Sequence, residues 1–257
     1  MQNNTFSTLF IGQNLIKLSS VDSTNNYLRN LTSSNSEPLP EGTVIMADHQ
    51  FAGRGQRGNV WHAAPKKNLT FSVLLKPNFI TAEHQFLINI LVSVAINVVL
   101  AKYVPLGLSI KWPNDIYVND KKIGGVLIEN TIVGSNIKQS IIGIGLNINQ
   151  SVFEDELKTS AVSISQILQQ DVNLMVLLNE ICVQLEQLYL KLRLGKEKTL
   201  QELYTSKLYR LNQIAKYIYK GKVFDGVLEG VSSTGLLRIK PLNDDVLEFG
   251  FKEVAFV

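Results

Sequence analysis

The longest apolar stretch of the sequence, FLINILVSVAINVVLAKYV at residues 86–104, constrains the fold more than any other segment. Its polar residues Asn89, Ser93 and Asn97 recur every four positions, so on a helix they form one stripe and leave the other faces apolar. The same polar positions argue against a membrane span. Such a helix is stable in water only when other layers of structure cover its apolar faces. We therefore expect a helix that is buried except along this polar stripe.

The segments on either side of this helix predict strands and further helices. The predicted strands are 14–20, 43–49, 68–76, 108–113, 116–119, 122–130 and 140–149, and the predicted helices are 23–31, 82–103, 160–170, 174–193 and 198–208. Thr81 is a suitable N-cap for the long helix. Turn signals, Asn-Asp at 119–120 and Gly-Ser-Asn at 134–136, join the last four strands into an antiparallel meander. These elements predict an α+β fold with a mixed or antiparallel sheet.

The texture of the sequence changes after about residue 211. From there on, short β-rich runs alternate with Gly, Asp and Asn turns, and the segment suits a small barrel of about five strands. A chain of 257 residues is long enough for one large domain and one small domain. We expect the large domain over residues 1–210 and the small β domain over residues 211–257.

Composition excludes several classes of protein. A net charge of +3 is too weak to indicate nucleic-acid binding by itself. The single cysteine, Cys182, excludes an internal disulfide framework, and the three histidines lack metal-ligand spacing. The opening residues, MQNNTFSTLF, lack the pattern of a secretion signal. We expect a soluble, cytoplasmic protein with no membrane anchor and no metal site of its own.

The stretch FAGRGQRGNVW at residues 51–61 has the G-x-G-x-x-G spacing of a dinucleotide fingerprint but not its context. That fingerprint needs a helix directly after the glycines, and here another strand follows instead. Asn59 and Val60 replace the Lys and Ser/Thr of a Walker A motif. The segment is therefore a loop between two strands. Its glycines permit close backbone approach, and its arginines and N–H groups suit an anion.

Further polar residues are predicted at the ends of strands, where they are costly unless they are paired. They are Ser23, Thr24, Asn25, Gln50, the KWPND stretch at 111–115, the KKIGG stretch at 121–125, and Asn147. Two adjacent glycines, Gly124 and Gly125, indicate a β-bulge or the close approach of a ligand. Taken singly, these residues are as well explained as caps, turns and edge lysines. Together they resemble a nucleoside triphosphate site without a Walker A motif, with four cations for phosphate: Arg54, Arg57, Lys111 and Lys122.

The motifs GRGQRGNVW, KWPNDIYV, KKIGGVLIE and GIGLNIN, in this order and spacing, resemble those of the biotin protein ligases. The resemblance runs from about Ser19 to the C-terminal β segment. It implies an α+β catalytic domain related to the lipoate ligases, followed by an SH3-like barrel. Some members begin with a DNA-binding helix-turn-helix domain. Only about a dozen residues precede the first predicted strand here, so we expect the ligase-only form and no binding of nucleic acid.

The resemblance implies a reaction in two steps. Biotin and ATP, with Mg²⁺, form biotinyl-5′-AMP and pyrophosphate, and a lysine of a biotin carboxyl carrier protein or domain then takes the biotinyl group. The implied catalytic residues are Lys122, Arg54 and Asp115. The implied biotin-binding residues are Ser23, Thr24, Asn25, Gln50, Gly53, Arg54, Gly55, Gln56, Lys122, Gly125 and Val126. The implied ATP- and adenylate-binding residues are Arg54, Gln56, Arg57, Trp61, Lys111, Asn114 and Asn147.

One residue departs from the family pattern, and two other functions stay open. Gln56 stands where some members have an arginine over the adenylate. A lipoate or octanoate transfer enzyme on the same fold is the first alternative, although the neutral polar residues favour the ureido ring of biotin. A non-catalytic RNA-binding module is the second, and the weak net charge argues against it. We expect a monomer or a weak homodimer.

Overall fold

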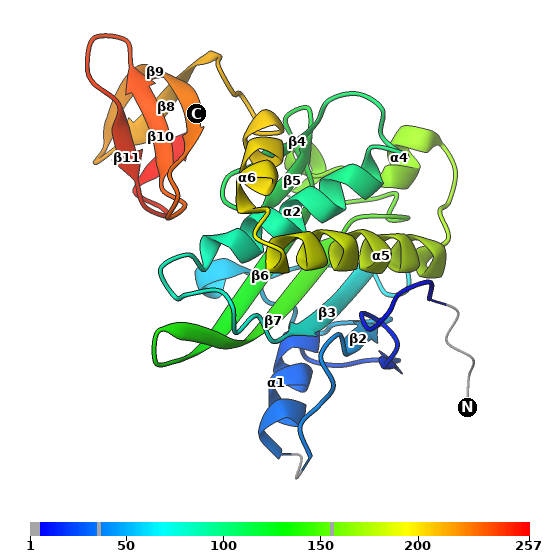
Figure 1. Ribbon diagram of the computed structural model, residues 1–257. Coiled ribbons are helices and arrows are strands. Elements are labelled where there is room, and N and C mark those ends of the chain that lie inside the picture. The colour runs from blue at the N-terminus through cyan, green and yellow to red at the C-terminus, as the bar shows by residue number, and fades with distance from the viewer. Residues whose placement is uncertain (1–5, 35–36, 155–156) are drawn as a thin grey trace.

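The computed structural model describes residues 6–34, 37–154 and 157–257, with the side chain of Arg57 left out, and it contains two sheets (Figure 1). The larger sheet has the order β1-β2-β3-β7-β6-β5-β4. Its strands are β1 (Leu15–Leu18), β2 (Val44–Ala47), β3 (Leu69–Leu75), β4 (Leu108–Lys111), β5 (Asp115–Val118), β6 (Lys121–Val133) and β7 (Asn136–Leu146). The pair β1 and β2 is parallel and the other pairs are antiparallel, so the predicted α+β fold with a mixed sheet is confirmed.

Helices cover the two faces of this sheet unequally (Figure 1). Its main apolar face packs against α2 (Phe86–Leu100), with α5 (Leu174–Arg193) and α6 (Glu197–Ser206) packed against α2. The opposite face is covered in part by α1 (Thr24–Ser34). Side chains alternate accordingly along β3: Phe71 and Val73 belong to the main core, whereas Ser72 points to the α1 side. The remaining helical segments are η1 (Gln56–Gly58), α3 (Leu157–Ser160) and α4 (Ile164–Leu168).

The long helix begins later than predicted. It starts at Phe86 rather than at residue 82, and Gln85 rather than Thr81 occupies the N-cap position. Thr81 instead forms a β-bridge with Asn136, and the backbone N–H of Ala82 donates to the carbonyl of Ser135 at 2.8 Å. These contacts tie the segment to the β6–β7 hairpin, so it enters the helix through turns. The predicted cap was therefore wrong.

The polar stripe of α2 does not lie on the surface, contrary to the prediction. Ser93 is 0% exposed and Asn97 is 2% exposed, whereas Val98 is 36% exposed. The helix lies between the sheet and the helices α5 and α6, so these layers cover Ser93 and Asn97 as well as the apolar faces, and only Asn89 of the stripe is partly exposed. Within the described part of the chain, the Ser93 hydroxyl and the Asn97 amide nitrogen have no hydrogen-bond partner. The spacing predicted the helix correctly but not the side that faces solvent.

The C-terminal segment forms a second, fully antiparallel sheet with the order β11-β10-β9-β8-β12. Its strands are β8 (Ile214–Tyr219), β9 (Lys222–Val231), β10 (Leu237–Pro241), β11 (Leu247–Phe249) and β12 (Val254–Phe256). The five strands agree with the predicted SH3-like barrel. The domain boundary after residue 210 stays a prediction. None of the helices in the described ranges is long and apolar enough to cross a membrane.

A buried carboxylate fastens the N-terminal segment to the helical layer. Glu186 of α5 is 6% exposed and accepts hydrogen bonds from the backbone N–H groups of Leu9, Phe10 and Ile11, at 2.7, 2.8 and 2.9 Å. A carboxylate that accepts several backbone N–H groups makes strong, charge-assisted hydrogen bonds. Glu186 therefore holds the approach to β1 in place.

We predict that Glu186→Ala lowers the free energy of unfolding by roughly 2–4 kcal/mol, because three backbone N–H groups, that of Ile11 in a buried bond, lose a charged acceptor. Glu180→Ala on the same helix is the matched control. Glu180 pairs with Lys102 at the surface, and such a pair contributes about 0–1 kcal/mol. Urea denaturation measures both variants, and equal losses would contradict the anchoring role of Glu186.

Candidate functional site

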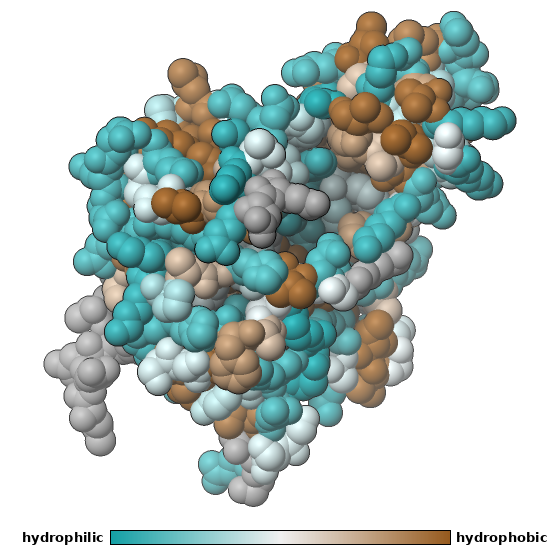
Figure 2. Space-filling model, turned by 180° about the vertical axis from the view of Figure 1, so that it is seen from behind, coloured by the Kyte–Doolittle hydropathy of each residue, from teal (hydrophilic) through white to brown (hydrophobic). Residues whose placement is uncertain are grey.

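The face of the larger sheet opposite α2 is hollow because glycines occupy its centre. Gly125 of β6 pairs with Gly145 of β7, and Gly143 lies two residues before Gly145 on the same face. Mainly hydrophilic side chains surround the hollow on this side of the molecule (Figure 2). It contains a cavity of about 210 Å³. The cavity is lined by Ser23, Thr24, Asn25, Gln50, Arg54, Gly55, Gln56, Asn59, Val60, Trp61, Lys111, Trp112, Pro113, Asn114, Asp115, Lys122, Gly125, Val126, Leu127, Gly143, Ile144, Gly145 and Phe251.

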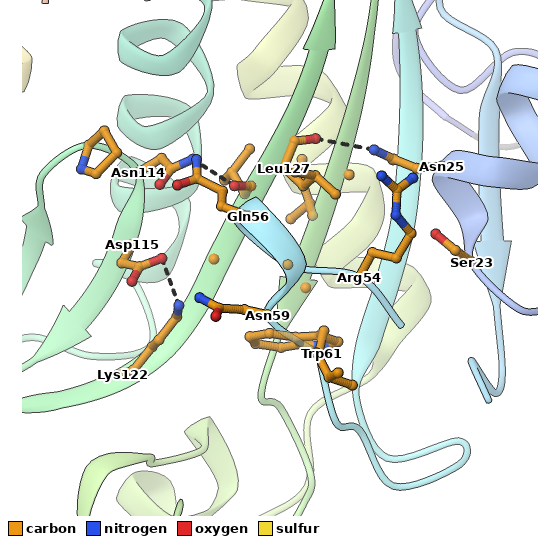
Figure 3. Close-up of a pocket in the computed structure, with 18 of the residues that line it drawn as sticks. Ser23, Asn25, Arg54, Gln56, Asn59, Trp61, Asn114, Asp115, Lys122 and Leu127 are labelled. Carbon is orange, nitrogen blue, oxygen red and sulfur yellow. Dashed lines mark hydrogen bonds and ion pairs between the residues drawn. The ribbon is translucent and has the colours of Figure 1, made fainter. Parts of the chain in front are cut away.

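The glycine- and arginine-rich loop forms one wall of the cavity. It folds back on itself: the N–H of Trp61 donates to the carbonyl of Gly53 at 2.9 Å, and that of Gly55 to the carbonyl of Asn59 at 2.7 Å. Only the single 3₁₀ turn η1 lies within it, so the prediction of a loop between two strands is confirmed. Gly125, Gly143 and Gly145 form the floor of the cavity, called the glycine floor below. The Trp61 ring lies on this floor, where a Cβ on Gly145 would come within 2.5 Å of it (Figure 3).

One end of the cavity is neutral and rich in hydrogen-bonding groups. The N–H and hydroxyl of Thr24 donate to Gln50 Oε1 at 2.8 and 3.1 Å. Ser72 Oγ lies 2.7 Å from Thr24 Oγ1 and 2.6 Å from Asn25 Oδ1. Ser23, Thr24 and Asn25 are buried and line the cavity, so they face a ligand there rather than bulk water. Ser72 was not predicted from the sequence, and its one signal is that it shares with Thr70 the polar face of a strand whose other residues are apolar.

The other end of the cavity is cationic. Lys122 Nζ lies 2.7 Å from Asp115 Oδ1 and 6.0 Å from the centre of the Trp61 ring (Figure 3). A Cβ on Gly125 would lie 3.1 Å from both Asp115 Oδ1 and Lys122 Cε, so the glycine leaves room for this pair. The β5–β6 register shifts next to the Gly124-Gly125 pair, which confirms the bulge predicted there. Asn114 is 2% exposed, and its amide is fixed by donation to the carbonyl of Val126 at 2.6 Å.

Lys111 lies where the two sheets meet. Its Nζ is 3.3 Å from the hydroxyl of Tyr117, and it faces the rings of Tyr117, Tyr209 and Phe256 at 4.8, 5.8 and 5.3 Å. Burial lowers the pKa of Lys111 from its usual value. Burial, together with the charge of Asp115, raises the pKa of Tyr117 to about 12, so Tyr117 is a neutral partner at ordinary pH.

The smaller sheet contributes directly to this end of the site. Phe251 lines the cavity and its ring lies 6.0 Å from that of Trp112. The indole N–H of Trp112 donates to the carbonyl of Gly235 at 3.0 Å. Phe251 and Phe256 were not predicted from the sequence, because aromatic residues in a small β domain are usual core residues and no spacing links them to KWPND.

Arg54 lines the cavity, but its guanidinium points away from Lys122. It donates to Asn26 Oδ1 at 2.6 Å and to Glu129 Oε1 at 3.0 Å. Among the predicted phosphate-binding cations whose side chains are described, Arg54 is thus held by Asn26 and Glu129 instead of lying beside Lys122.

Three further predicted residues lie elsewhere or are not described. Gly53 lines two hollows next to the cavity rather than the cavity itself. Asn147 is 4% exposed and directly follows β7, but it is not among the lining residues. The side chain of Arg57 lies outside the described part of the structure. All the other predicted site residues line the one cavity. In the described ranges, no group of three His, Cys, Asp or Glu side chains is placed to hold a metal ion.

The mixed sheet thus carries, on its glycine-rich face, one cavity with a neutral end and a cationic end. Residues 18–147, about half of the chain, match the model of the biotin/lipoate A/B protein ligase family, and the chain belongs to this family.

Individual relatives extend this comparison. The chain is 37% identical over 161 residues to the bifunctional ligase/repressor BirA of Bacillus subtilis, a match that covers 62% of this chain and 48% of that protein. The chain thus spans about half the length of this relative. It is 29% identical over 238 residues to BirA of Escherichia coli, covering 89% and 70% of the two chains. The biotin protein ligase of Aquifex aeolicus, solved with biotin and ATP, superposes with a TM-score of 0.80 at 27% identity, covering 95% and 99% of the chains.

We predict that Gly145→Ala displaces the Trp61 ring, because a Cβ 2.5 Å from the indole cannot be accommodated without movement. Quenching of tryptophan fluorescence by acrylamide should therefore increase. Trp112, the other tryptophan, is 8% exposed and supplies a constant background. In the control Gly145→Ala/Trp61→Phe the increase should be absent. Unchanged quenching in Gly145→Ala would show that Trp61 does not rest on this floor in solution.

Proposed function

We propose that this protein is a biotin–protein ligase that activates biotin as biotinyl-5′-AMP and transfers it to a lysine of a carrier protein or domain. The main support is that one cavity combines a neutral end, at Thr24 and Asn25, with a cationic end, at Lys122. Biotin has the same polarity, with a neutral ureido ring at one end and a carboxylate at the other. The similar Aquifex aeolicus structure contains both biotin and ATP.

In the first step, a carboxylate oxygen of biotin attacks the α-phosphorus of ATP. The bond from this phosphorus to the bridging oxygen breaks, and pyrophosphate leaves. Catalysis of such a step depends on positioning and on fixed positive charge at the oxygens where negative charge develops. We assign this charge to Lys122, which acts electrostatically and forms no covalent bond. Lys111 serves the phosphates that leave, and its aromatic neighbours limit the positions of its ammonium group.

In the second step, the amine of the acceptor lysine attacks the acyl carbon of biotinyl-AMP. The bond from this carbon to the phosphate oxygen breaks, AMP leaves, and the nitrogen loses a proton as the amide forms. Asp115 is one-third exposed and lies beside Lys122. We propose that Asp115 orients the incoming ammonium or amine group of the acceptor lysine.

The residues at the cationic end fit a Mg²⁺ ion that arrives with ATP. Mg²⁺ binds oxygen ligands, chiefly substrate phosphates with one or two carboxylates. Asp115 is the one carboxylate among the described cavity-lining residues, and the residue before it, Asn114, also lines the cavity. These two residues would hold the ion. When bound, the ion neutralises phosphate charge. Because the reaction consumes ATP, we place it in the cytoplasm.

Incubation of the protein with biotin, Mg-ATP and a carrier domain tests the proposal directly. The carrier should gain one biotinyl group by mass, and exchange of labelled pyrophosphate into ATP should depend on biotin. Exchange supported by lipoate or octanoate but not by biotin would favour the other branch of the family. The neutral hydrogen-bonding end argues against that outcome, because a plain acyl chain has no hydrogen-bonding group to place against it.

We predict that Lys122→Ala leaves the fold intact and reduces biotin-dependent pyrophosphate exchange by about 10²–10³-fold, because a preorganised charge is lost. Lys121→Ala is the matched control: Lys121 is the preceding residue on β6, is exposed and does not line the cavity. Near-normal exchange by Lys122→Ala would overturn the role assigned to this lysine.

We predict that Gln56→Arg slows the escape of biotinyl-AMP from the enzyme. Gln56 lines the cavity and offers a neutral amide, whereas arginine would grip phosphate through charge-assisted hydrogen bonds. The charged bond contributes roughly 1.5–3 kcal/mol and the neutral one about 0.5–1.5 kcal/mol. Filter retention of labelled adenylate gives the dissociation rate, with Arg57→Ala measured in parallel. If neither variant changes the rate, closure by Trp61 controls retention rather than the arginine content of the loop.

A further inference from the structure

Glu129 of β6 lies outside the cavity but contacts the residues that form its neutral end. Its Oε2 accepts a hydrogen bond from Asn25 Nδ2 at 2.8 Å. Its Oε1 faces the guanidinium of Arg54 at 3.0 Å and also pairs with Arg29. The side chain is 21% exposed. One carboxylate of the larger sheet thus contacts both helix α1 and the glycine- and arginine-rich loop.

The contacts of Glu129 determine which way the Asn25 amide points. Asn25 Nδ2 faces two acceptors, Glu129 Oε2 and the carbonyl of Leu127 at 3.3 Å. An ionised carboxylate and a backbone carbonyl can only accept hydrogen bonds, so the nitrogen of the amide has to face them. The amide oxygen therefore lies on the opposite side, above the glycine floor, where a Cβ on Gly143 would come within 2.5 Å of it.

The arginines determine which carboxylate oxygen is left for Asn25. Arg54 and Arg29 both approach Oε1, so Oε2 remains for the amide. Arg54 is itself held by Asn26, whose Nδ2 donates to Asp22 Oδ2 at 2.7 Å. The orientation of the carboxylate therefore depends on both α1 and the glycine loop.

We propose that Glu129 is a positioning residue that makes Asn25 a hydrogen-bond acceptor toward the cavity and thereby selects an acid whose far end carries N–H donors. This inference rests on the proposed function, in which the ureido N–H groups of biotin meet this end of the cavity. Asn25 contacts the ligand, and Glu129 acts through Asn25. An acid with only acceptors or only apolar groups at that end cannot donate a hydrogen bond to the Asn25 oxygen, which beside such a ligand keeps only the bond from Ser72 Oγ at 2.6 Å.

Glu129→Gln tests the proposal with little change in shape. The two arginines can only donate, so the carbonyl oxygen of the introduced glutamine has to face them and its NH₂ group has to face Asn25. The closer of the two contacts of Asn25 Nδ2 thus becomes donor against donor, which drives the Asn25 amide to turn although the carbonyl of Leu127 at 3.3 Å favours the original orientation. The turned amide presents its NH₂ group to the N–H donors of biotin. We expect the KM for biotin in pyrophosphate exchange to rise about 10- to 100-fold, the loss expected when a buried hydrogen bond is replaced by two opposed donors. The KM for ATP and the melting temperature should stay near their original values.

Two further variants separate positioning from a general structural effect. Arg29→Gln removes a contact of the same carboxylate oxygen at a residue that does not line the cavity, and Arg54 remains on that oxygen. It should change the KM for biotin by less than about 5-fold, as expected for a half-exposed ion pair. Adding Asn25→Asp to Glu129→Gln restores an acceptor facing the cavity, because the introduced aspartate accepts from the NH₂ group of the introduced glutamine. This double variant should recover most of the lost affinity for biotin.

The outcomes are distinguishable. If the original protein shows no biotin-dependent exchange, the proposed function itself fails. If it is active and Glu129→Gln leaves the KM for biotin unchanged, or raises the KM for ATP equally, the positioning role is overturned. Should Glu129→Gln not fold, Asn25→Asp supplies the second test. Asn25→Asp alone places the introduced aspartate against the carboxylate of Glu129. The double variant removes this repulsion, so it should bind biotin more tightly than Asn25→Asp. Weaker binding by the double variant would overturn the inference.

Discussion

Pairing of Gly125 with Gly145 at the centre of the larger sheet is the constraint on which the site depends. Because side chains alternate along a strand, neighbouring positions such as Val126 and Ile144 complete the core against α2, while the glycines leave the other face empty. Side chains from other elements line the space that the glycines leave: the Trp61 ring lies on the glycine floor, and the Lys122–Asp115 ion pair lies beside Gly125. A side chain at these positions would keep the fold but fill the site.

Most of the fold could be predicted because its signals are local. Strand alternation, turn residues and the spacing of apolar residues are properties of neighbouring residues, and α5 (Leu174–Arg193) has the predicted bounds. The predictions that were wrong concern contacts between residues that are distant in sequence. Thr81 has the chemistry of a cap but is held by Asn136, which is distant in sequence. Ser93 belongs to a regular polar stripe that helices α5 and α6 then cover.

The site was predicted from motifs rather than from spacing, and its limits follow from that. Motif residues such as Gln50 and Asn114 do line the cavity, whereas Phe251 and Ser72 come from segments without a distinctive pattern. Glu129 is the last residue of the KKIGGVLIE motif, but the motif did not predict a role for it. A glutamate in a strand is usually a solvated charge, and only the approach of two arginines and an amide from other elements gives it a different role.

The contact between the two sheets has a consequence for modularity. Lys111 and Trp112 are adjacent in sequence, and both are held by the smaller sheet: the first faces Phe256, and the second contacts Phe251 and the carbonyl of Gly235. The small sheet is therefore not an exchangeable appendage. In a chimera with the smaller sheet of a relative, Lys111 would contact different side chains. The larger and the smaller sheet therefore have to change together during evolution. Natural variation at Phe251 and Phe256 should be tied to variation around the KWPND segment.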